Sequence, residues 1–230
     1  MLYIINSILY RGNLTTAERL LDELKNLIRI FPEWDRKPNE WLIANPAKDI
    51  MAFSHLEIST EALEYLRDTI LKRKSVSIVL AGEEKDDSPV IIWFHNTPAV
   101  SVDRYSLTIA IRSPQDFNDR HAFQKIIEDM SMLTQWSYSF ISLETEQYRM
   151  KQRSVFEDRL AAGWMLLLPK EISSEEVPSA ADVINYPETK STLIITKDKF
   201  DGNSDADITC ANNVEIELAG NGFLPKWFDL

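Results

Sequence analysis

The pattern of hydrophobic and polar positions predicts several strands. Runs rich in β-branched and aromatic residues, and runs in which apolar and polar residues alternate, are typical of strands. The segments of this kind are residues 2–10, 76–80, 90–94, 107–111, 138–143, 164–168 and 193–196. The run 164–168 is apolar throughout and ends at Pro169. We therefore expect Trp164 and Leu166 to be almost fully buried.

Other stretches carry apolar side chains at the helical period of 3.6 residues. The predicted helices are residues 15–31, capped by Thr15 or Thr16, residues 60–71, capped by Ser59 or Thr60, residues 120–135, and a short helix within residues 175–183. Pro178 restricts the last of these to its first turn or breaks it. A proline-bearing loop that contains Trp34 and Trp41 is expected before the second helix, and residues 210–218 fit either a helix or a strand.

The order of these elements predicts the fold class. Three strand-like runs between residues 76 and 111 follow one another without a helix, which favours an antiparallel meander. Helices lie on either side of this meander in the sequence. We predict an α+β fold with mixed α/β composition, in which helices pack on a largely antiparallel sheet. Because no linker composition marks a boundary, residues 1–230 are predicted to form a single domain.

The charge of the chain narrows the choice of partner. The formal net charge is -11, and direct binding to nucleic acid is disfavoured because phosphate contacts need clusters of Lys and Arg. Twelve acidic and four basic residues lie between Glu171 and Leu230, so this last part of the chain carries a net charge of -8. The acidity either keeps the chain soluble or attracts a basic partner. Asp201, Asp205 and Asp207 are candidate partner-binding residues on the second interpretation.

Cysteine content and hydropathy suggest a location. Cys210 is the only cysteine, which excludes an intramolecular disulfide and fits a reducing compartment. No apolar stretch reaches the roughly 18 residues of a membrane span. Residues 2–10 lack the basic flank and the cleavage site of a signal peptide. We expect a cytoplasmic protein without a membrane partner, in which Cys210 is a buried structural residue.

Catalytic chemistry has little support in the sequence. The three histidines, His55, His95 and His121, are far apart, and neither a nucleophile elbow nor a phosphate-binding glycine loop is present. The acidic loop that starts at Asp201 resembles a calcium loop but has Ala206 where the turn needs glycine, and Asn212 where a bidentate Glu is needed. The pairs Glu144/Glu146 and Glu215/Glu217 would share one face if they lay on strands. We expect no catalytic residue, cofactor or metal ligand.

Six tryptophans provide candidates for packing and for contact. Trp93, Trp136 and Trp164 lie in or beside predicted core elements, and we interpret them as packing residues. Trp34, Trp41 and Trp227 lie outside those elements. Each of the latter either packs in the core or anchors a partner, because exposed aromatic residues next to carboxylates are typical of interfaces.

Residues 150–227 resemble a known family. Val155-Phe156-Glu157-Asp158-Arg159 followed by the run from Gly163 to Pro169, GWMLLLP, is similar to the FxDR…GWMLYLP segment of the immunity protein 52 family. Glu176-Val177-Pro178 resembles the QVP element of that family. Asn212-Asn213-Val214-Glu215-Ile216-Glu217-Leu218 and Leu224-Pro225 resemble its NAIEIRL-like stretch and its closing LLP. Leu167, Asn213 and Glu217 depart from the family pattern, and Glu217 replaces a basic residue.

The resemblance implies a function without catalysis. Proteins of this family are cognate immunity proteins of polymorphic toxin systems, and they neutralise a secreted toxin that is often delivered by a type VI secretion system. The paired toxins look like nucleases of the restriction-endonuclease fold, whose basic DNA-binding face an acidic protein can cover. We expect a cognate toxin as partner, with Asp201, Asp205, Asp207, Glu217 and Trp227 as candidate contacts. The alternatives are an adaptor or structural component of the secretion apparatus and, further away, a hydrolase.

Overall fold

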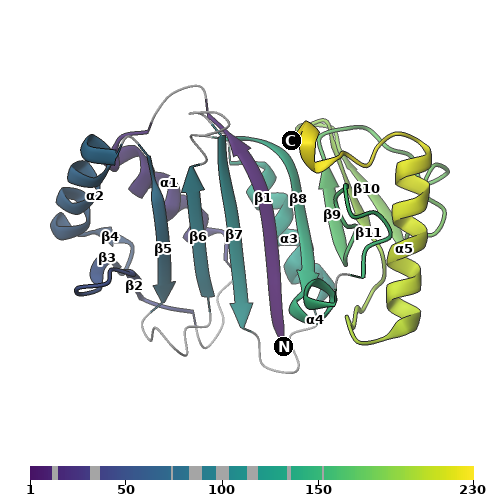
Figure 1. The fold of residues 1–230 in the computed structure, drawn as a ribbon, viewed down its shortest axis with the longest axis horizontal. Helices are drawn as coiled ribbons and strands as arrows, with labels where there is room; N and C mark the ends of the chain where they lie inside the picture. Colours follow the sequence, from purple (N-terminus) through teal and green to yellow (C-terminus); the bar gives the residue numbers. More distant parts are fainter. Residues whose placement is uncertain are drawn as a thin grey trace. The chain divides into compact units, whose positions relative to one another are not determined.

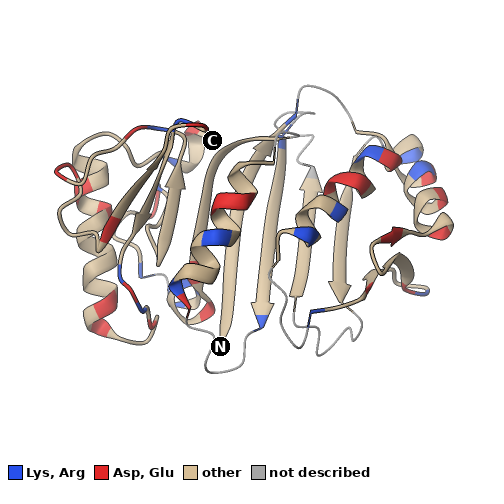
Figure 2. Ribbon diagram, turned by 180° about the vertical axis from the view of Figure 1, so that it is seen from behind, with Lys and Arg blue, Asp and Glu red and all other residues tan. Residues whose placement is uncertain are grey.

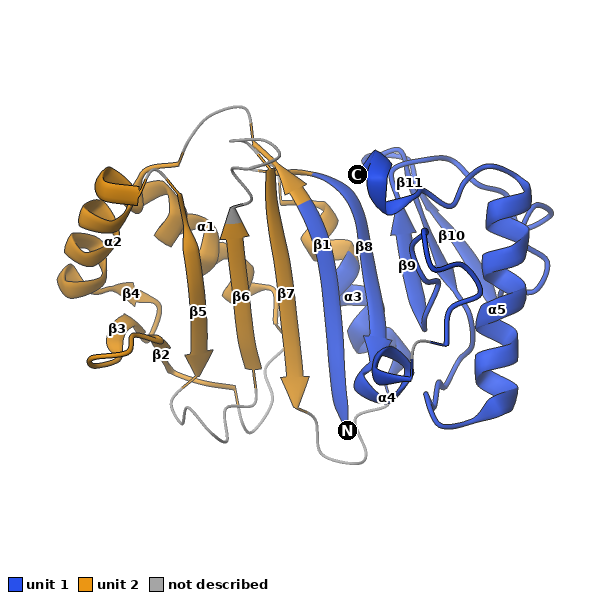
Figure 3. Ribbon diagram, in the orientation of Figure 1, with its two compact units in different colours: residues 1–8, 113–127, 138–230 blue, residues 9–112, 128–137 orange. Residues whose placement is uncertain are grey.

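The structure of the chain is a computed structural model, which describes residues 1–11, 15–31, 37–73, 75–82, 90–96, 104–112, 119–133, 136–151 and 153–230. It divides into two compact units (Figure 3). Unit 1 comprises Met1–Ile8, Ser113–Ile127 and Tyr138–Leu230, and unit 2 comprises Leu9–Arg112 and Glu128–Ser137. The chain passes from one unit to the other within β1, between Arg112 and Ser113, within α3 and within β8, so each unit is built from separate stretches of sequence. The single domain over residues 1–230 stays a prediction.

Unit 1 contains most of β1 (Leu2–Tyr10), the start of α3 (Arg120–Ser131) and nearly all of β8 (Ser137–Thr145). The remaining elements of unit 1 are α4 (Glu146–Met150), β9 (Met165–Leu168), β10 (Asp182–Tyr186), β11 (Ser191–Ile195), α5 (Asp205–Gly220) and the short 3-10 helix η1 (Trp227–Asp229). Its strands follow the order β10-β11-β9-β8-β1. The pairings β10–β11, β11–β9 and β9–β8 are all antiparallel (Figure 1).

Unit 2 contains the meander and two helices. Its elements are α1 (Ala17–Arg29), β2 (Glu40–Ile43), β3 (Ile50–Ser54), β4 (Glu57–Ile58), α2 (Thr60–Arg73), β5 (Ser77–Gly82), β6 (Val90–Asn96) and β7 (Arg104–Arg112). Antiparallel pairing gives the strand order β7-β6-β5-β2-β3-β4. The predicted meander and the predicted α+β class with a largely antiparallel sheet are both confirmed. Charged residues are fewer on the strands than on the helices (Figure 2).

The core of unit 1 is centred on three aromatic rings. The ring of Trp164 lies 5.7 Å from that of Tyr3 and 5.4 Å from that of Phe123. The indole Nε1 of Trp164 donates a hydrogen bond of 2.7 Å to the carbonyl of Lys197, which satisfies its one polar group. Trp164 and Leu166 are fully buried, as predicted.

The core of unit 2 includes a buried ion pair. Arg11 and Glu23 are both buried and form a salt bridge, and the Arg11 guanidinium lies 4.9 Å from the centre of the Tyr105 ring. The indole Nε1 of the buried Trp136 donates to Glu23 at 3.3 Å. Burial lowers the pKa of Arg11 to about 10, but the guanidinium stays charged at neutral pH because this pKa still lies well above 7.

Several sequence predictions about elements were wrong. Trp41 is in strand β2 and is buried, where a loop was expected, and Trp93 is 38% exposed on β6, where packing was expected. Residues 175–183 form turns and the start of β10, and contain no helix. Residues 210–218, which fitted either a helix or a strand, belong to helix α5. Trp34 lies outside the described residues.

Candidate partner-binding surface

Two segments of unit 1 lie side by side through backbone contacts. Arg159 and Lys226 form an isolated antiparallel bridge, and the N–H of Trp227 donates to the carbonyl of Asp158 at 2.9 Å. The Arg159 guanidinium donates to the carbonyl of Leu224 at 2.7 Å. We name residues 155–159 and 226–229 together the C-terminal aromatic surface. These contacts hold its two segments at a fixed spacing.

Aromatic side chains are displayed on this surface. Phe228 is 96% exposed and Trp227 is 48% exposed, and both belong to η1, at the C-terminal end of the trace in Figure 1. One edge of Trp227 meets Phe140 in a T-shaped contact with a centroid distance of 6.0 Å. The contact orients the indole and leaves about half of it open to solvent. Two adjacent exposed aromatic residues are typical of the anchors that dominate protein–protein binding.

The two segments of this surface also carry charged residues. Lys226 pairs with Asp158 at 3.0 Å, and the guanidinium of Arg159 lies over Phe156, 5.8 Å from its ring centre. Glu157 and Asp229 are exposed. Lys226 and Arg159, the two cationic residues of the surface, thus make contacts within unit 1. The exposed carboxylates of Glu157 and Asp229 have no such partner among the described residues and give the surface its negative charge.

Asp201 and Asp205 are the two exposed members of the predicted acidic set. Asp205 begins α5, and its side chain is 90% exposed and 3.8 Å from Arg153. Asp201 accepts a hydrogen bond from the N–H of Asn203 at 2.9 Å and is also exposed. An ion pair this open is strongly screened by water. Both charges therefore contribute to the field that a basic partner would experience.

Asp207 has a different environment. It is buried in the first turn of α5, where its carboxylate pairs with Lys197 and accepts the N–H of Asp201 at 2.9 Å. Burial alone would raise the pKa of Asp207, but the hydrogen bonds from Lys197 and from the Asp201 backbone hold it below its usual range. The charge of Asp207 is therefore used to fix the turn that leads into α5.

Glu217 is also engaged within unit 1. Its carboxylate accepts hydrogen bonds from the N–H of Ser179, at 3.0 Å, and from the Ser179 hydroxyl. These contacts connect the C-terminal half of α5 to the turn before β10. Glu215 and Glu217 do not share a face, because both lie on a helix and are two residues apart. Glu146 likewise lies at the start of α4 while Glu144 is on β8, so neither predicted carboxylate pair forms on a strand.

Glu215 is fully buried and organises the segment that precedes β9. Its carboxylate accepts the N–H of Val155 at 2.7 Å, the N–H of Ala162 at 3.1 Å and the hydroxyl of Tyr148 at 2.8 Å. Burial raises the pKa of Glu215 above its ordinary value even though these donors oppose the shift. Burial, followed by the charge of Glu215, raises the pKa of Tyr148 as well.

A second carboxyl group lies beside this cluster. Burial raises the pKa of Glu144 to about 7, the nearby charge of Glu215 adds to the shift, and Arg149 and a hydrogen bond of 3.1 Å from Asn6 oppose it. Glu144 is thus partly protonated at neutral pH. Both carboxyl groups are held by contacts within unit 1.

The residues that carry the family resemblance have structural roles here. Gly163 has a φ of 55°, and a Cβ atom at this position would lie 2.9 Å from the carbonyl oxygen of Leu143. Arg159 holds the segment at Leu224, Glu215 holds the segment at Val155, and Trp164 fills the core. These residues hold together the part of unit 1 that displays the aromatic side chains of η1.

Phe228 is the surface residue that the sequence reasoning missed. It is the most exposed large hydrophobic residue among the described residues, yet only its neighbour Trp227 was a candidate. The signal in the sequence was its position, because Phe228 directly follows Trp227 and directly precedes Asp229. Cys210 was predicted to be buried and is half-buried and free.

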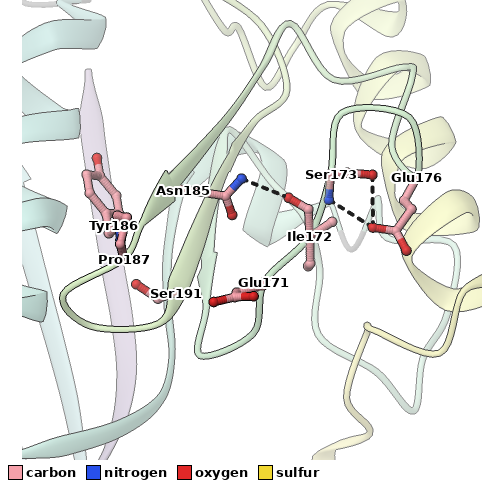
Figure 4. A pocket seen from close by; sticks show the side chains of 8 residues that line it. All are labelled: Glu171, Ile172, Ser173, Glu176, Asn185, Tyr186, Pro187 and Ser191. Atoms are coloured by element: carbon pink, nitrogen blue, oxygen red, sulfur yellow. Dashed lines mark hydrogen bonds between the residues drawn. The ribbon is translucent and has the colours of Figure 1, made fainter.

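A pocket of about 300 Å³ lies elsewhere on unit 1 (Figure 4). It is formed by the segment before the turn at residues 174–176 and by the β10–β11 hairpin. Its lining residues are Glu171, Ile172, Ser173, Glu176, Asn185, Tyr186, Pro187 and Ser191. Among the described residues, no group of three or more His, Cys, Asp and Glu side chains is arranged to hold a metal ion.

The comparison with solved structures finds a likeness in fold. The chain is similar in fold to the Pseudomonas aeruginosa T6SS protein PA0821. The likeness has a TM-score of 0.55 and 11% sequence identity, and covers 94% of this chain and 76% of that chain. No family model and no curated protein matches the sequence. None of the helices in the described part of the chain has the length and apolar character needed to cross a bilayer.

Proposed function

We propose that this chain is an immunity protein, which binds and neutralises a cognate secreted bacterial toxin. The observation that carries the proposal is the exposed pair Trp227 and Phe228, displayed by the segments that resemble the immunity protein 52 family. An exposed aromatic pair of this kind serves binding, because it would otherwise cost solubility. The likeness in fold to a T6SS protein supports a role in type VI secretion.

The toxin in this proposal is a nuclease of the restriction-endonuclease fold. A nuclease presents a basic face to DNA, and the acidic residues Asp201, Asp205, Glu157 and Asp229 are exposed on unit 1. Aromatic anchors then supply the affinity, while the charges accelerate the encounter. The chain itself performs no reaction in this proposal, and the partner that it inhibits is a protein.

Co-expression tests the proposal. The toxin gene adjacent to the gene for this chain is expressed in a bacterial host alone, with this chain, or with the Trp227→Ala/Phe228→Ala variant. We expect the wild-type chain to restore growth and the variant to restore it much less at equal soluble amounts. Loss of growth in the presence of the wild-type chain would contradict the immunity role. If this chain gave no protection and copurified stoichiometrically with tube or baseplate proteins of the secretion apparatus, the adaptor alternative would be favoured.

A further inference from the structure

Two buried carboxyl groups and a tyrosine lie against residues 155–163, the segment that contains the first part of the C-terminal aromatic surface. Glu215 of α5 accepts the N–H of Val155 at 2.7 Å and the N–H of Ala162 at 3.1 Å. The hydroxyl of Tyr148, on α4, donates to the same carboxylate at 2.8 Å. One carboxylate thus holds this segment near both of its ends.

Glu144 of β8 is the second carboxyl group, and we name Glu144, Tyr148 and Glu215 together the carboxyl cluster. The backbone of Gly163 packs against Glu144, because a Cβ atom at Gly163 would lie 3.3 Å from the Cβ of Glu144. The carboxylate of Glu144 accepts a bond of 3.1 Å from Asn6, and its charge is repelled by that of Glu215. Within the described residues, the one cation that acts on this pair of carboxyls is Arg149, whose Nε lies 3.8 Å from Glu144.

The protonation of this pair depends on whether the segment is closed over it. Glu215 is fully buried and the side chain of Glu144 is 14% exposed, so burial disfavours the charged form of both. Burial accordingly raises the pKa of both carboxyls, that of Glu144 to about 7. When the segment opens, water reaches the pair and each pKa returns toward its ordinary value of 4.5. The closed segment therefore binds more protons near neutral pH than the open one, and a rise in pH favours opening.

The second part of the aromatic surface is attached to the same segment. The N–H of Trp227 donates to the carbonyl of Asp158 at 2.9 Å, and the N–H of Leu160 donates to the carbonyl of Pro225 at 3.2 Å. Opening of residues 155–163 breaks these two bonds. The exposed aromatic residues of η1 then lose the backbone contacts that orient them.

We infer that the carboxyl cluster makes the order of the C-terminal aromatic surface depend on pH. The surface is ordered when the cluster holds a proton, at mildly acidic pH, and it loosens as the pH rises above neutral. The inference rests on the proposed function for the identity of what the surface binds, and it adds a means by which that binding is regulated. A partner held by Trp227 and Phe228 would dissociate faster at alkaline pH.

Amide hydrogen exchange of the chain alone, without toxin, tests the inference. Protection factors of the Val155, Ala162 and Trp227 amides, corrected for the intrinsic pH dependence of exchange, should fall by about tenfold between about pH 5.5 and about pH 8. Glu144→Gln cannot ionise and should flatten this fall. Glu188→Gln, at an exposed position, is the matched control and should leave the wild-type profile unchanged. The wild-type profile decides the question even if Glu144→Gln does not fold.

Two results would overturn the inference. The first is wild-type protection of the three amides that does not change with pH. The second is protection equal at every pH to that of the buried Thr196, whose N–H donates to the carbonyl of Trp164 at 2.9 Å, because the segment would then open only when the core unfolds. Since the exchange experiment contains no toxin, its failure would leave the immunity proposal intact, and failure of the co-expression assay would leave the exchange result intact.

Discussion

Individual carboxyl groups in unit 1 are divided between two kinds of environment. Asp201 and Asp205 are exposed, whereas Glu215, Glu144 and Asp207 are held in contacts that the fold needs. Composition gives the net charge of the whole set but does not distinguish the two kinds. That distinction depends on neighbours that are far away in sequence, such as Tyr148 and Glu215, which are 67 residues apart.

Glu144 should make the stability of the protein depend on pH. Its folded pKa of about 7 lies above its ordinary value of 4.5, so its contribution to stability is fully present below about pH 4.5 and is lost as the pH rises through about 7. In Glu144→Gln the free energy of unfolding should fall less steeply over this interval. Urea unfolding at several pH values measures this free energy for the wild type and the variant. Glu188→Gln, at an exposed position, is the control. Identical pH profiles for wild type and Glu144→Gln would refute the assignment.

Asp207 and Asp205 should differ sharply in their effect on stability, although both were predicted to be contact residues. Asp207→Asn removes a charge-assisted contact with Lys197 and weakens the bond from the Asp201 N–H, so we expect a cost of about 1.5–3 kcal/mol. Asp205→Asn changes an exposed side chain and should alter stability by less than about 0.5 kcal/mol. Chemical denaturation measures both, and equal costs would show that the pairing of Asp207 contributes little.

Elements with a strong local pattern were predictable. Strand β1 has the predicted bounds, Thr16 caps α1, and the meander β5–β6–β7 has the predicted pairing. Strand β2 was missed because nearby prolines suggested a loop, whereas it pairs with both β3 and β5. The start of β10 was missed because residues 175–183 were interpreted as a short helix, whereas β10 pairs with β11. The pairing of β2 with β5, which joins Trp41 to Gly82, is distant in sequence and leaves little trace in a short local window.

Helix α5 shows why one segment stayed ambiguous. Its β-branched residues lower its helical preference, while its buried side chains recur at helical spacing. The C-terminal aromatic surface was only partly predictable for a related reason. Trp227 was a candidate because it is an aromatic residue outside the predicted core elements. The segment that lies beside it is distant in sequence, because Arg159 lies 67 residues before its bridge partner Lys226. No local pattern indicates that contact.

Strand β9 should depend on Trp164 for its stability. Trp164→Ala removes a fully buried ring that packs on Tyr3 and Phe123, and we expect a loss of about 3–5 kcal/mol. The half-exposed Trp93→Ala is the matched control and should cost markedly less. The midpoints of guanidinium unfolding compare the two variants. A wild-type midpoint for Trp164→Ala would contradict the assignment of β9 as a core strand.

At the scale of the whole molecule, charge and aromatic contact have separate tasks in the proposed function. A net charge of -11 favours encounter with a basic partner from a distance, and an exposed aromatic pair favours retention once contact is made. The sequence predicted the charge and one of the two aromatic residues. The fold also distinguishes the carboxylates that a partner could reach from those that it could not. Asp207 and Glu217 are bound to other residues of unit 1.

Association with the toxin should therefore depend on salt. Asp201→Asn/Asp205→Asn should lower the association rate constant several-fold at low ionic strength and flatten its salt dependence. Glu61→Gln/Asp68→Asn removes the same charge from exposed positions of α2 in unit 2 and should change the rate much less. Stopped-flow measurements at two ionic strengths compare the variants. An association rate that salt does not affect would exclude electrostatic steering.

The dissociation constant of the purified complex between this chain and the toxin tests the central claim most directly. Trp227→Ala/Phe228→Ala should weaken binding by at least about 2 kcal/mol, mainly through faster dissociation, because these residues are the exposed aromatic anchors. Leu71→Ala, which removes an apolar side chain that is 79% exposed on α2, should leave the constant unchanged. Wild-type affinity in the double variant, with the fold intact by circular dichroism, would contradict the account.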